Sequence, residues 1–177
     1  MGISEGTDDG GWNSLEAARV GAHHTNSDKQ EMEYIREVAG SRAHDGRLDA
    51  GLRKQWAKLS LQVNARMHGG GPWEQAHMAA NSAWLRTGMI EAFGPDPDDA
   101  DWDPTAVVSD LLCALTMTPG QARSLSSCWT ELPIDQIGAL RRIKNITAPL
   151  QQLIRHMPPG PLRDRALEWL ALRPLLP

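Results

Sequence analysis

The feature of this sequence that most constrains its fold is the spacing of its apolar residues, which recur at every third or fourth position. The clearest run lies between residues 48 and 67 and follows steps of 4, 4, 3, 4 and 4: Leu48, Leu52, Trp56, Leu59, Val63 and Met67. Because an α-helix completes one turn in about 3.6 residues, this spacing places all six side chains on one face. We therefore expect an amphipathic helix that packs on a neighbour through this face.

Two helix start signals are as informative as this periodicity. Asp103-Pro104 and Thr118-Pro119 each place a capping side chain before a proline, which suits the first helical turn because that position needs no N–H. In the second signal Gln121 follows at the third helical position and completes a capping box. Since the two caps lie fifteen residues apart, two short consecutive helices are predicted, at 104–116 and 119–131.

Glycine and proline residues mark where other helices should end or break. A helix beginning at a Ser27 cap is predicted to stop at Gly40, since glycine takes the left-handed conformation after a helix at little cost. Pro149 should kink or split a long helix at 133–157 near Thr147, because its ring clashes with the preceding turn. No stretch alternates apolar and polar residues in the manner of a β-strand. We therefore predict an all-α fold, an irregular helical bundle of about six or seven helices that ends in a helical hairpin.

Composition divides the chain into four segments. The first is rich in Gly, Ser, Asp and Asn, and the third carries five aspartates and two prolines within ten residues, a pattern typical of a linker. The helical patterns lie between and after these two. The predicted organisation is a flexible N-terminal segment (1–26), an N-terminal helical layer (27–93), an acidic linker (94–103) and a C-terminal helical subdomain (104–177).

The charge of the chain is modest and uneven. The net charge is −4, but residues 105–177 carry eight Lys or Arg against five Asp or Glu. This balance argues against non-specific coating of nucleic acid, while the C-terminal part remains compatible with a specific contact. The N-terminus lacks a basic segment followed by an apolar run, and no apolar stretch approaches the roughly 20 residues that span a bilayer. We expect a cytoplasmic protein without a membrane partner, and the preference for Arg over Lys is typical of a GC-rich bacterial or phage genome.

No residue pattern predicts a metal ion or another cofactor. His68 and His77 flank a glycine turn, but no histidine pair has the i, i+4 spacing of a zinc-binding helix. The acidic stretch lacks the central Gly and the terminal Glu of a calcium loop. Gly69–Gly71 precedes a helix without the strand or the Lys-Ser/Thr pair of a phosphate loop. We therefore predict no metal site and no cofactor.

The two cysteines, Cys113 and Cys128, fall on neighbouring predicted helices and do not form a Cys-x-x-Cys pair. In a reducing cytosol we expect both to be small, buried apolar residues. The sequence does not decide whether they form a disulfide. That bond needs a Cα separation below about 7 Å, and the spacing of the two residues along the chain does not give this distance.

Tryptophan is the main source of large aromatic surface in this chain, with seven Trp against one Tyr and one Phe. Four of the seven lie on apolar helix faces and are expected in the core: Trp56, Trp84, Trp129 and Trp169. Three lie near the terminus or in loops, where a partly exposed Trp is a typical interface anchor: Trp12, Trp73 and Trp102. The leading hypothesis is a non-enzymatic helical adaptor or regulatory protein that contacts another protein or a second copy of itself.

A sequence-specific DNA-binding regulator is the first alternative. The two short helices form a helix-turn-helix-like unit at 104–131, whose second helix would enter the major groove. Its N-terminal end would present Gln121, Arg123 and Ser124 to the bases. Phosphate contacts would come from the helix that follows, through Arg141, Arg142 and Lys144.

A small helical ligand-binding protein or enzyme is the second alternative. Asp45, Glu74 and His77 are polar residues near predicted helix ends, where side chains from different helices can meet. No Ser/His/Asp or Cys/His set can be assembled from spacing alone. No catalytic residue is therefore assigned, and the sequence favours a function other than catalysis.

Overall fold

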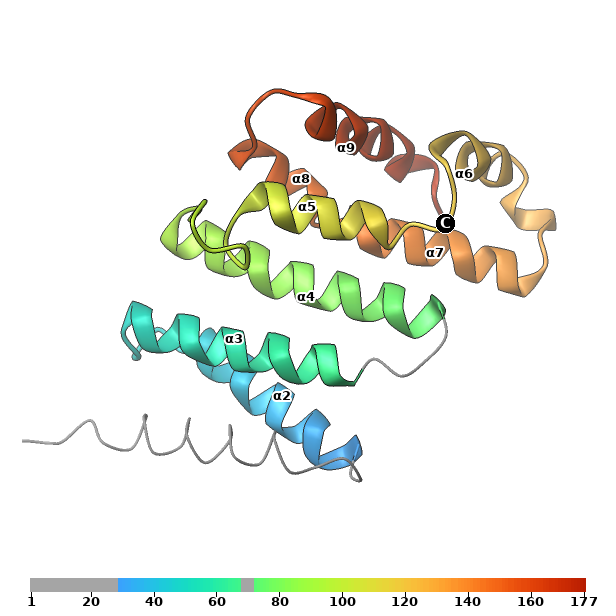
Figure 1. Cartoon of the computed structure of the whole chain (residues 1–177). Coiled ribbons are helices and arrows are strands. Elements are labelled where there is room, and N and C mark those ends of the chain that lie inside the picture. Colours follow the sequence, from blue (N-terminus) through green and yellow to red (C-terminus); the bar gives the residue numbers. More distant parts are fainter. Residues whose placement is uncertain (1–28, 68–71) are drawn as a thin grey trace, which may run out of the picture. The chain divides into compact units, whose positions relative to one another are not determined.

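The computed structural model describes residues 29–67 and 72–177, and every element of regular structure among them is a helix (Figure 1). The all-α prediction is confirmed, and the described residues contain no β-strand. The chain forms two compact units, Met1–Met67 and His68–Pro177. The first contains α2 (Lys29–Ala43) and α3 (Ala50–Arg66). The second contains α-helices and short 3₁₀ helices, labelled η: α4 (Pro72–Phe93), α5 (Pro104–Cys113), α6 (Pro119–Ser126), η1 (Trp129–Glu131), α7 (Ile134–Thr147), α8 (Leu150–Leu153), η2 (Ile154–His156), α9 (Pro161–Leu172) and η3 (Arg173–Leu175).

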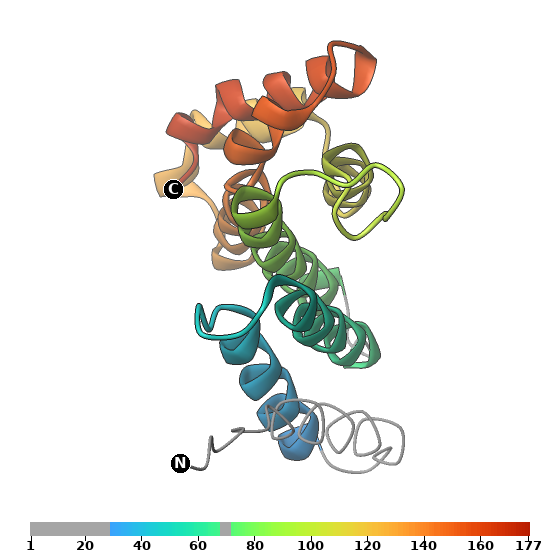
Figure 2. The ribbon, with the colours of Figure 1, turned by 90° about the vertical axis from the view of Figure 1, so that its left-hand side faces the viewer.

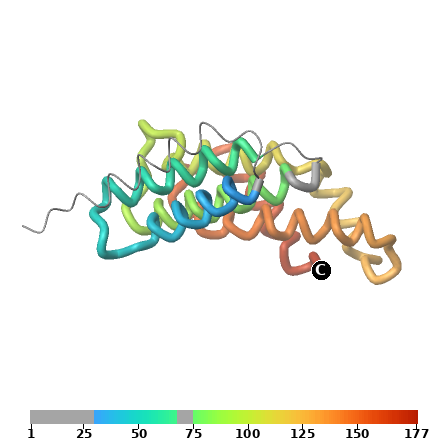
Figure 3. The backbone as a smooth tube through the Cα atoms, turned by 90° about the horizontal axis from the view of Figure 1, so that it is seen from below, coloured from blue at the N-terminus to red at the C-terminus, as the bar shows by residue number. Residues whose placement is uncertain are grey.

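The helices α2 and α3 form an antiparallel hairpin, which Figures 2 and 3 show from two sides. The predicted apolar stripe supplies the buried face of α3, where Trp56, Leu59 and Val63 are each at most 1% exposed. The buried face of α2 contains Ile35 and, toward the end of the helix, the small residues Ala39 and Ala43, which are fully buried. Small side chains let the two backbones approach closely, and the Ser60 hydroxyl donates a hydrogen bond to the Arg36 carbonyl across the pair (3.2 Å).

The helix α2 does not stop at Gly40 as predicted but continues to Ala43. The reason is tertiary: Gly40 lies opposite α3, where a Cβ atom would meet the Ser60 Oγ at 3.8 Å. A glycine in a helix interior is disfavoured by about 1 kcal/mol, which the packing of this helix face offsets. The predicted Ser27 cap lies outside the described residues.

The turn between α2 and α3 is held by short-range polar contacts. Asp49 caps α3, accepting a hydrogen bond from the Leu52 N–H at 2.9 Å. Arg53 Nε donates to the Ala43 carbonyl at 2.8 Å, which satisfies an acceptor at the end of α2. Asp45 accepts hydrogen bonds from the Arg47 side chain at 2.9 and 2.8 Å and from its backbone N–H at 3.0 Å. These contacts satisfy polar groups on both sides of the turn between α2 and α3.

The helix starts predicted in the second unit are confirmed. Asp103 accepts from the backbone N–H groups of Thr105 and Ala106 at the start of α5. Both halves of the capping box at α6 are present, between Thr118 and Gln121. In contrast, α6 ends at Ser126 rather than continuing to residue 131, and η1 follows. Serine hydroxyls at positions 124, 126 and 127 each bond a preceding carbonyl of this segment, a pattern that weakens and bends a helix.

Proline and glycine control the last part of the chain. The long predicted helix splits as expected, because α7 ends at Thr147 and α8 begins at Leu150, directly after Pro149. After the turn at residues 158–160 the chain reverses, and α9 returns antiparallel to α7 (Figure 1). It packs on α7 and α8, which gives the predicted hairpin, and also on α5 and α6.

The second unit is arranged in layers, with α4 on one side, α5 and α7 in the middle, and α9 on the other (Figure 1). The sequence placed α4 with the N-terminal helices and put the boundary in the acidic stretch at 94–103. The structure instead begins the second compact unit at His68, and α4 packs on α5 and α7. The apolar residues on more than one side of α4 explain this, since Ala76, Ala83 and Met89 are all buried.

We predict that Gly40→Ala raises the free energy of unfolding by about 0.5–1 kcal/mol, because alanine restricts the unfolded chain and its Cβ fits. Chemical denaturation of the full chain measures this. Gly94→Ala is the matched control of opposite sign, because Gly94 ends α4 with φ of 83°, where a Cβ is strained. A loss of stability in Gly40→Ala would contradict the continuous α2 helix.

A second prediction concerns Asp45. Its hydrogen bonds from the Arg47 side chain, and then from the Arg47 backbone, lower the pKa of Asp45 from 3.8 to about 2. Because this pKa is lower in the folded chain, the stabilisation is present above pH 3.8 and is lost as the pH falls through about 2. Asp45→Asn should therefore lower the urea midpoint relative to the unsubstituted chain at pH 7, and the difference should disappear near pH 2. Asp98→Asn is the control, and a difference for Asp45→Asn that does not change with pH would contradict the prediction.

Candidate functional site

The exposure of three tryptophan side chains differs from the sequence prediction. Trp102, predicted as a partly exposed partner contact, is 1% exposed and belongs to the core. Trp84 and Trp129, predicted as core residues, are 46% and 39% exposed. Trp12 and the side chain of Trp73, the other two predicted contacts, lie outside the described residues. Trp102 is therefore corrected to a structural residue.

The acidic stretch buries Trp102 because it folds into a closed loop. The Trp102 N–H donates to the Asp99 carbonyl at 2.8 Å, and the Trp102 carbonyl accepts from the Asp96 N–H at 2.9 Å. Arg86 on α4 pairs with Asp101 in the loop at 3.2 Å and with Asp110 on α5 at 2.9 Å. Arg86 thus ties the loop to α4 and α4 to α5, and the tryptophan of the loop packs inward.

The histidines and cysteines considered for a metal site or a disulfide form neither among the described residues. No group of three or more His, Cys, Asp or Glu side chains among the described residues is placed to hold a metal ion. His77 is exposed on α4, with its Nε2 3.3 Å from the Asn81 amide nitrogen. Cys113 and Cys128 are free thiols, and Cys113 is exposed rather than buried as expected. His68 and the glycine run lie outside the described residues.

The predicted base-contacting residues of α6 serve the helix itself. The Gln121 Oε1 accepts a hydrogen bond from the Thr118 N–H at 2.9 Å, and the Ser124 hydroxyl donates to the Gly120 carbonyl at 3.1 Å. Arg123 is exposed. In addition, α5 packs mainly on α4, α8 and α9, whereas α6 packs on α7 and α9. The two helices therefore have mostly different partners, unlike the two packed helices of a helix-turn-helix.

The predicted phosphate contacts lie on α7, in the longest part of the second unit without acidic residues. Arg141 is exposed, and Arg142 and Lys144 are half-buried. Between Gln136 and Arg163 the sequence contains five Lys or Arg residues and no Asp or Glu. This stretch comprises nearly all of α7, together with α8 and η2, so the positive charge is concentrated on these elements.

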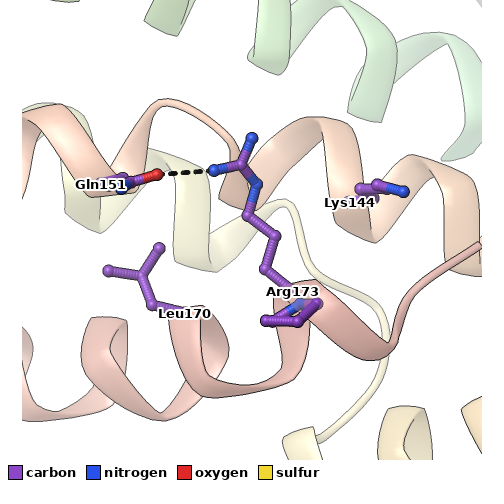
Figure 4. A pocket seen from close by; sticks show the side chains of 5 residues that line it. Lys144, Gln151, Leu170 and Arg173 are labelled. Carbon is purple, nitrogen blue, oxygen red and sulfur yellow. Dashed lines mark hydrogen bonds between the residues drawn. The ribbon is translucent and has the colours of Figure 1, made fainter.

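A pocket of about 480 Å³ lies where α7 and α8 meet the end of α9 and η3. It is lined by Lys144, Gln151, Leu170, Arg173 and Pro174 (Figure 4). Only Lys144 was among the predicted site residues. The others come from segments that give no local signal, because the pocket exists only after α9 folds back across α7 and α8.

The polar side chains of this pocket hold one another in place. Arg173 Nη1 donates to the Gln151 Oε1 at 2.8 Å, the bond drawn in Figure 4. Lys144 Nζ donates to the Leu176 carbonyl at 3.0 Å, which ties α7 to the C-terminal residues. Neither cation has a carboxylate within 4.0 Å among the described residues. Two positive charges therefore border one pocket, and the part of the chain that the structure describes supplies neither with an ion-pair partner.

Two further surface features lie at the other end of α7 and beside α6. Trp129 in η1 is 39% exposed, and Ile134 at the first position of α7 is 81% exposed. A hollow of about 650 Å³ lies at the start of α6 and includes two of the predicted DNA contacts; it is lined by Thr116, Met117, Gly120, Gln121, Ser124 and Leu125. The sequence predicted Trp129 in the core, on a helix at 119–131. The structure exposes it because α6 ends at Ser126, before this residue.

None of the described helices combines the length and the apolar character needed to cross a membrane. Comparison of the chain with protein-family models, with curated proteins and with solved structures finds no match. Its function must therefore be argued from its own side chains.

We predict that Trp102→Ala lowers the free energy of unfolding by about 3–5 kcal/mol, because it removes the side chain that the acidic loop buries. Trp84→Ala is the matched control and should cost less than about 1 kcal/mol, since that side chain is 46% exposed. Urea denaturation of both variants measures the difference. Equal losses would contradict the structural role given to Trp102.

Proposed function

We propose that this chain is a non-enzymatic adaptor or regulatory protein that binds an acidic segment of another protein along α7 and its neighbours. The observation that carries the proposal is that two features follow one another along the chain from η1 through α7 to the start of α9. Trp129 and Ile134 expose apolar surface at the start of this stretch, and the chain from Gln136 to Arg163 is basic and free of acidic residues. An apolar anchor beside a charged strip is the usual composition of a protein-binding surface.

Several observations favour a protein partner over DNA. The Gln121 and Ser124 side chains already bond within α6, so base contacts would have to break those bonds. The exposed Trp129 and Ile134 side chains are apolar and make no favourable contact with the charged phosphate backbone of DNA, whereas they can pack against an apolar residue of a polypeptide. The net charge of −4 also opposes the long-range attraction that assists DNA binding.

The same surface argues for a foreign partner over a second copy. In a two-fold dimer each copy presents the same patch, so α7 would face α7. The cations between Gln136 and Arg163 would then lie near one another, with acidic residues of the same surface present only at its start, at Glu131 and Asp135. An acidic segment avoids this repulsion.

A binding function agrees with the chemistry of the two pockets. The residues that line them include no His, Cys, Asp or Glu. Neither pocket therefore offers a carboxylate or an imidazole for proton transfer, or a thiol nucleophile. Asp45, considered as a polar candidate, is engaged with Arg47 in the first unit.

The proposal is tested by selecting random displayed peptides against the full chain. We expect the selected peptides to combine Asp or Glu with an aromatic or aliphatic residue. The double variant Trp129→Ser with Ile134→Ser should weaken their binding about tenfold or more, because exposed aromatic and aliphatic anchors dominate such contacts. Tyr34→Ser, which removes a side chain 67% exposed in the first unit, is the matched control and should leave binding unchanged.

Two outcomes would overturn the proposal. Selected peptides without an acidic bias, or binding that the double variant leaves unchanged, would remove the assigned surface. Binding of duplex DNA that falls steeply with salt and is lost in Arg141→Ala with Arg142→Ala would assign α7 to nucleic acid instead.

A further inference from the structure

We infer that the pocket lined by Lys144, Gln151, Leu170, Arg173 and Pro174 binds a carboxylate carried on a short apolar stem. The inference rests on the proposed function only for the source of that carboxylate, which would be an acidic side chain of the partner. The hydrogen-bonding groups of the pocket, its charge and its apolar wall all favour such a ligand.

Most of the free polar side-chain groups of the pocket are hydrogen-bond donors. Arg173 has no acceptor, so its bond to Gln151 at 2.8 Å requires the amide oxygen of Gln151 to point toward it. The Gln151 amide nitrogen then remains as a donor, together with the other N–H groups of Arg173. Lys144 uses one of its three N–H groups on the Leu176 carbonyl. A ligand that satisfies this pocket must therefore bring acceptors.

The charge of the pocket selects an anion among such ligands. Lys144 and Arg173 both border it, and the described residues place no carboxylate within 4.0 Å of either cation. The nearest acidic residues in sequence to Lys144 are Asp135 and Asp164, so α8 and η2 bring none of their own. Hydrogen bonds from cations to an anionic oxygen are about twice as strong as neutral ones.

The shape of the pocket favours a carboxylate with hydrocarbon attached to it. The guanidinium of Arg173 presents its donors in a planar fork that matches the two oxygens of a carboxylate. Leu170 and Pro174 form an apolar wall that an alkyl stem can cover. The volume of about 480 Å³ lies within the roughly 300–1,000 Å³ typical of small-molecule sites.

The test is a titration of the ¹⁵N-labelled full chain with hexanoate, followed by the backbone amide signals of residues 170–174 and the side-chain amide of Gln151. We expect hexanoate to shift these signals, and hexanamide, which has the same stem without the charge, to leave them unchanged. Inorganic phosphate should bind more weakly than hexanoate because it lacks the stem. Equal shifts with hexanamide, equal affinity for phosphate, or no shift with hexanoate would each overturn the inference.

Two variants sharpen the test. Gln151→Glu keeps an acceptor for Arg173 and places a carboxylate in the pocket, so hexanoate binding should weaken at least about tenfold. Gln62→Glu adds the same charge at an exposed position in the first unit and should leave the affinity unchanged. Arg173→Lys is the second variant, to be used if Gln151→Glu fails to fold. It keeps the positive charge but removes the planar fork of donors, so it should weaken hexanoate binding about tenfold. Unchanged hexanoate affinity in the folded variant would contradict the assigned site.

This inference and the proposed function fail separately. If Gln151→Glu abolishes hexanoate binding, the inferred pocket is supported, whatever peptides are selected. If in addition no acidic peptide is selected, only the proposed function is contradicted. Acidic peptides that bind through Trp129 and Ile134 support the proposed function, and unchanged hexanoate binding in Gln151→Glu then contradicts the pocket alone.

Discussion

Arg86 on α4 bonds Asp101 in the acidic loop and Asp110 on α5, and the loop between them buries Trp102. The other helices of the second unit depend on this arrangement, because it turns the chain after α4 and brings α5 back against that helix. Both α5 and α7 contact α4, and α9 packs on both of them. The loop is therefore a folded part of the core, held by one large aromatic side chain and one two-way ion pair, rather than a solvated linker.

The candidate site follows from that layered packing and from the break at Pro149. The break ends α7 and starts α8, and α9 then returns across both, so that Lys144, Gln151 and Arg173 meet from separate segments. The bond from Arg173 to Gln151 and the bond from Lys144 to the Leu176 carbonyl orient these side chains before any ligand binds, and orientation in advance reduces the entropy lost on binding. The described residues place no carboxylate within 4.0 Å of Lys144 or Arg173, which makes this pocket a stronger candidate than the larger hollow beside α6.

The sequence predicted the site less well than the fold, and Gln121 shows why. One side chain was assigned both to a capping box and to a base contact, and the structure uses it in the capping box, where it accepts from Thr118. The tryptophans show a second reason: a loop position predicts exposure only if nothing folds over it, and the acidic loop folds over its own Trp102. Gln151 and Arg173 carry no local signal at all, because they are 22 residues apart and meet through tertiary packing.

What the sequence determined by itself are the features that act within a few residues of the chain: the caps at Asp103 and Thr118, the break at Pro149, the stripe on α3 and hence the all-α class. These depend on hydrogen bonds and steric contacts between neighbours in sequence, so they are already decided in the local chain. Only the tertiary structure decided that α2 continues through Gly40, that α4 joins the later helices, and that Trp102 rather than Trp129 is buried. Each of these depends on contacts between residues distant in sequence, whose free energy of packing exceeds the local preference that opposes it.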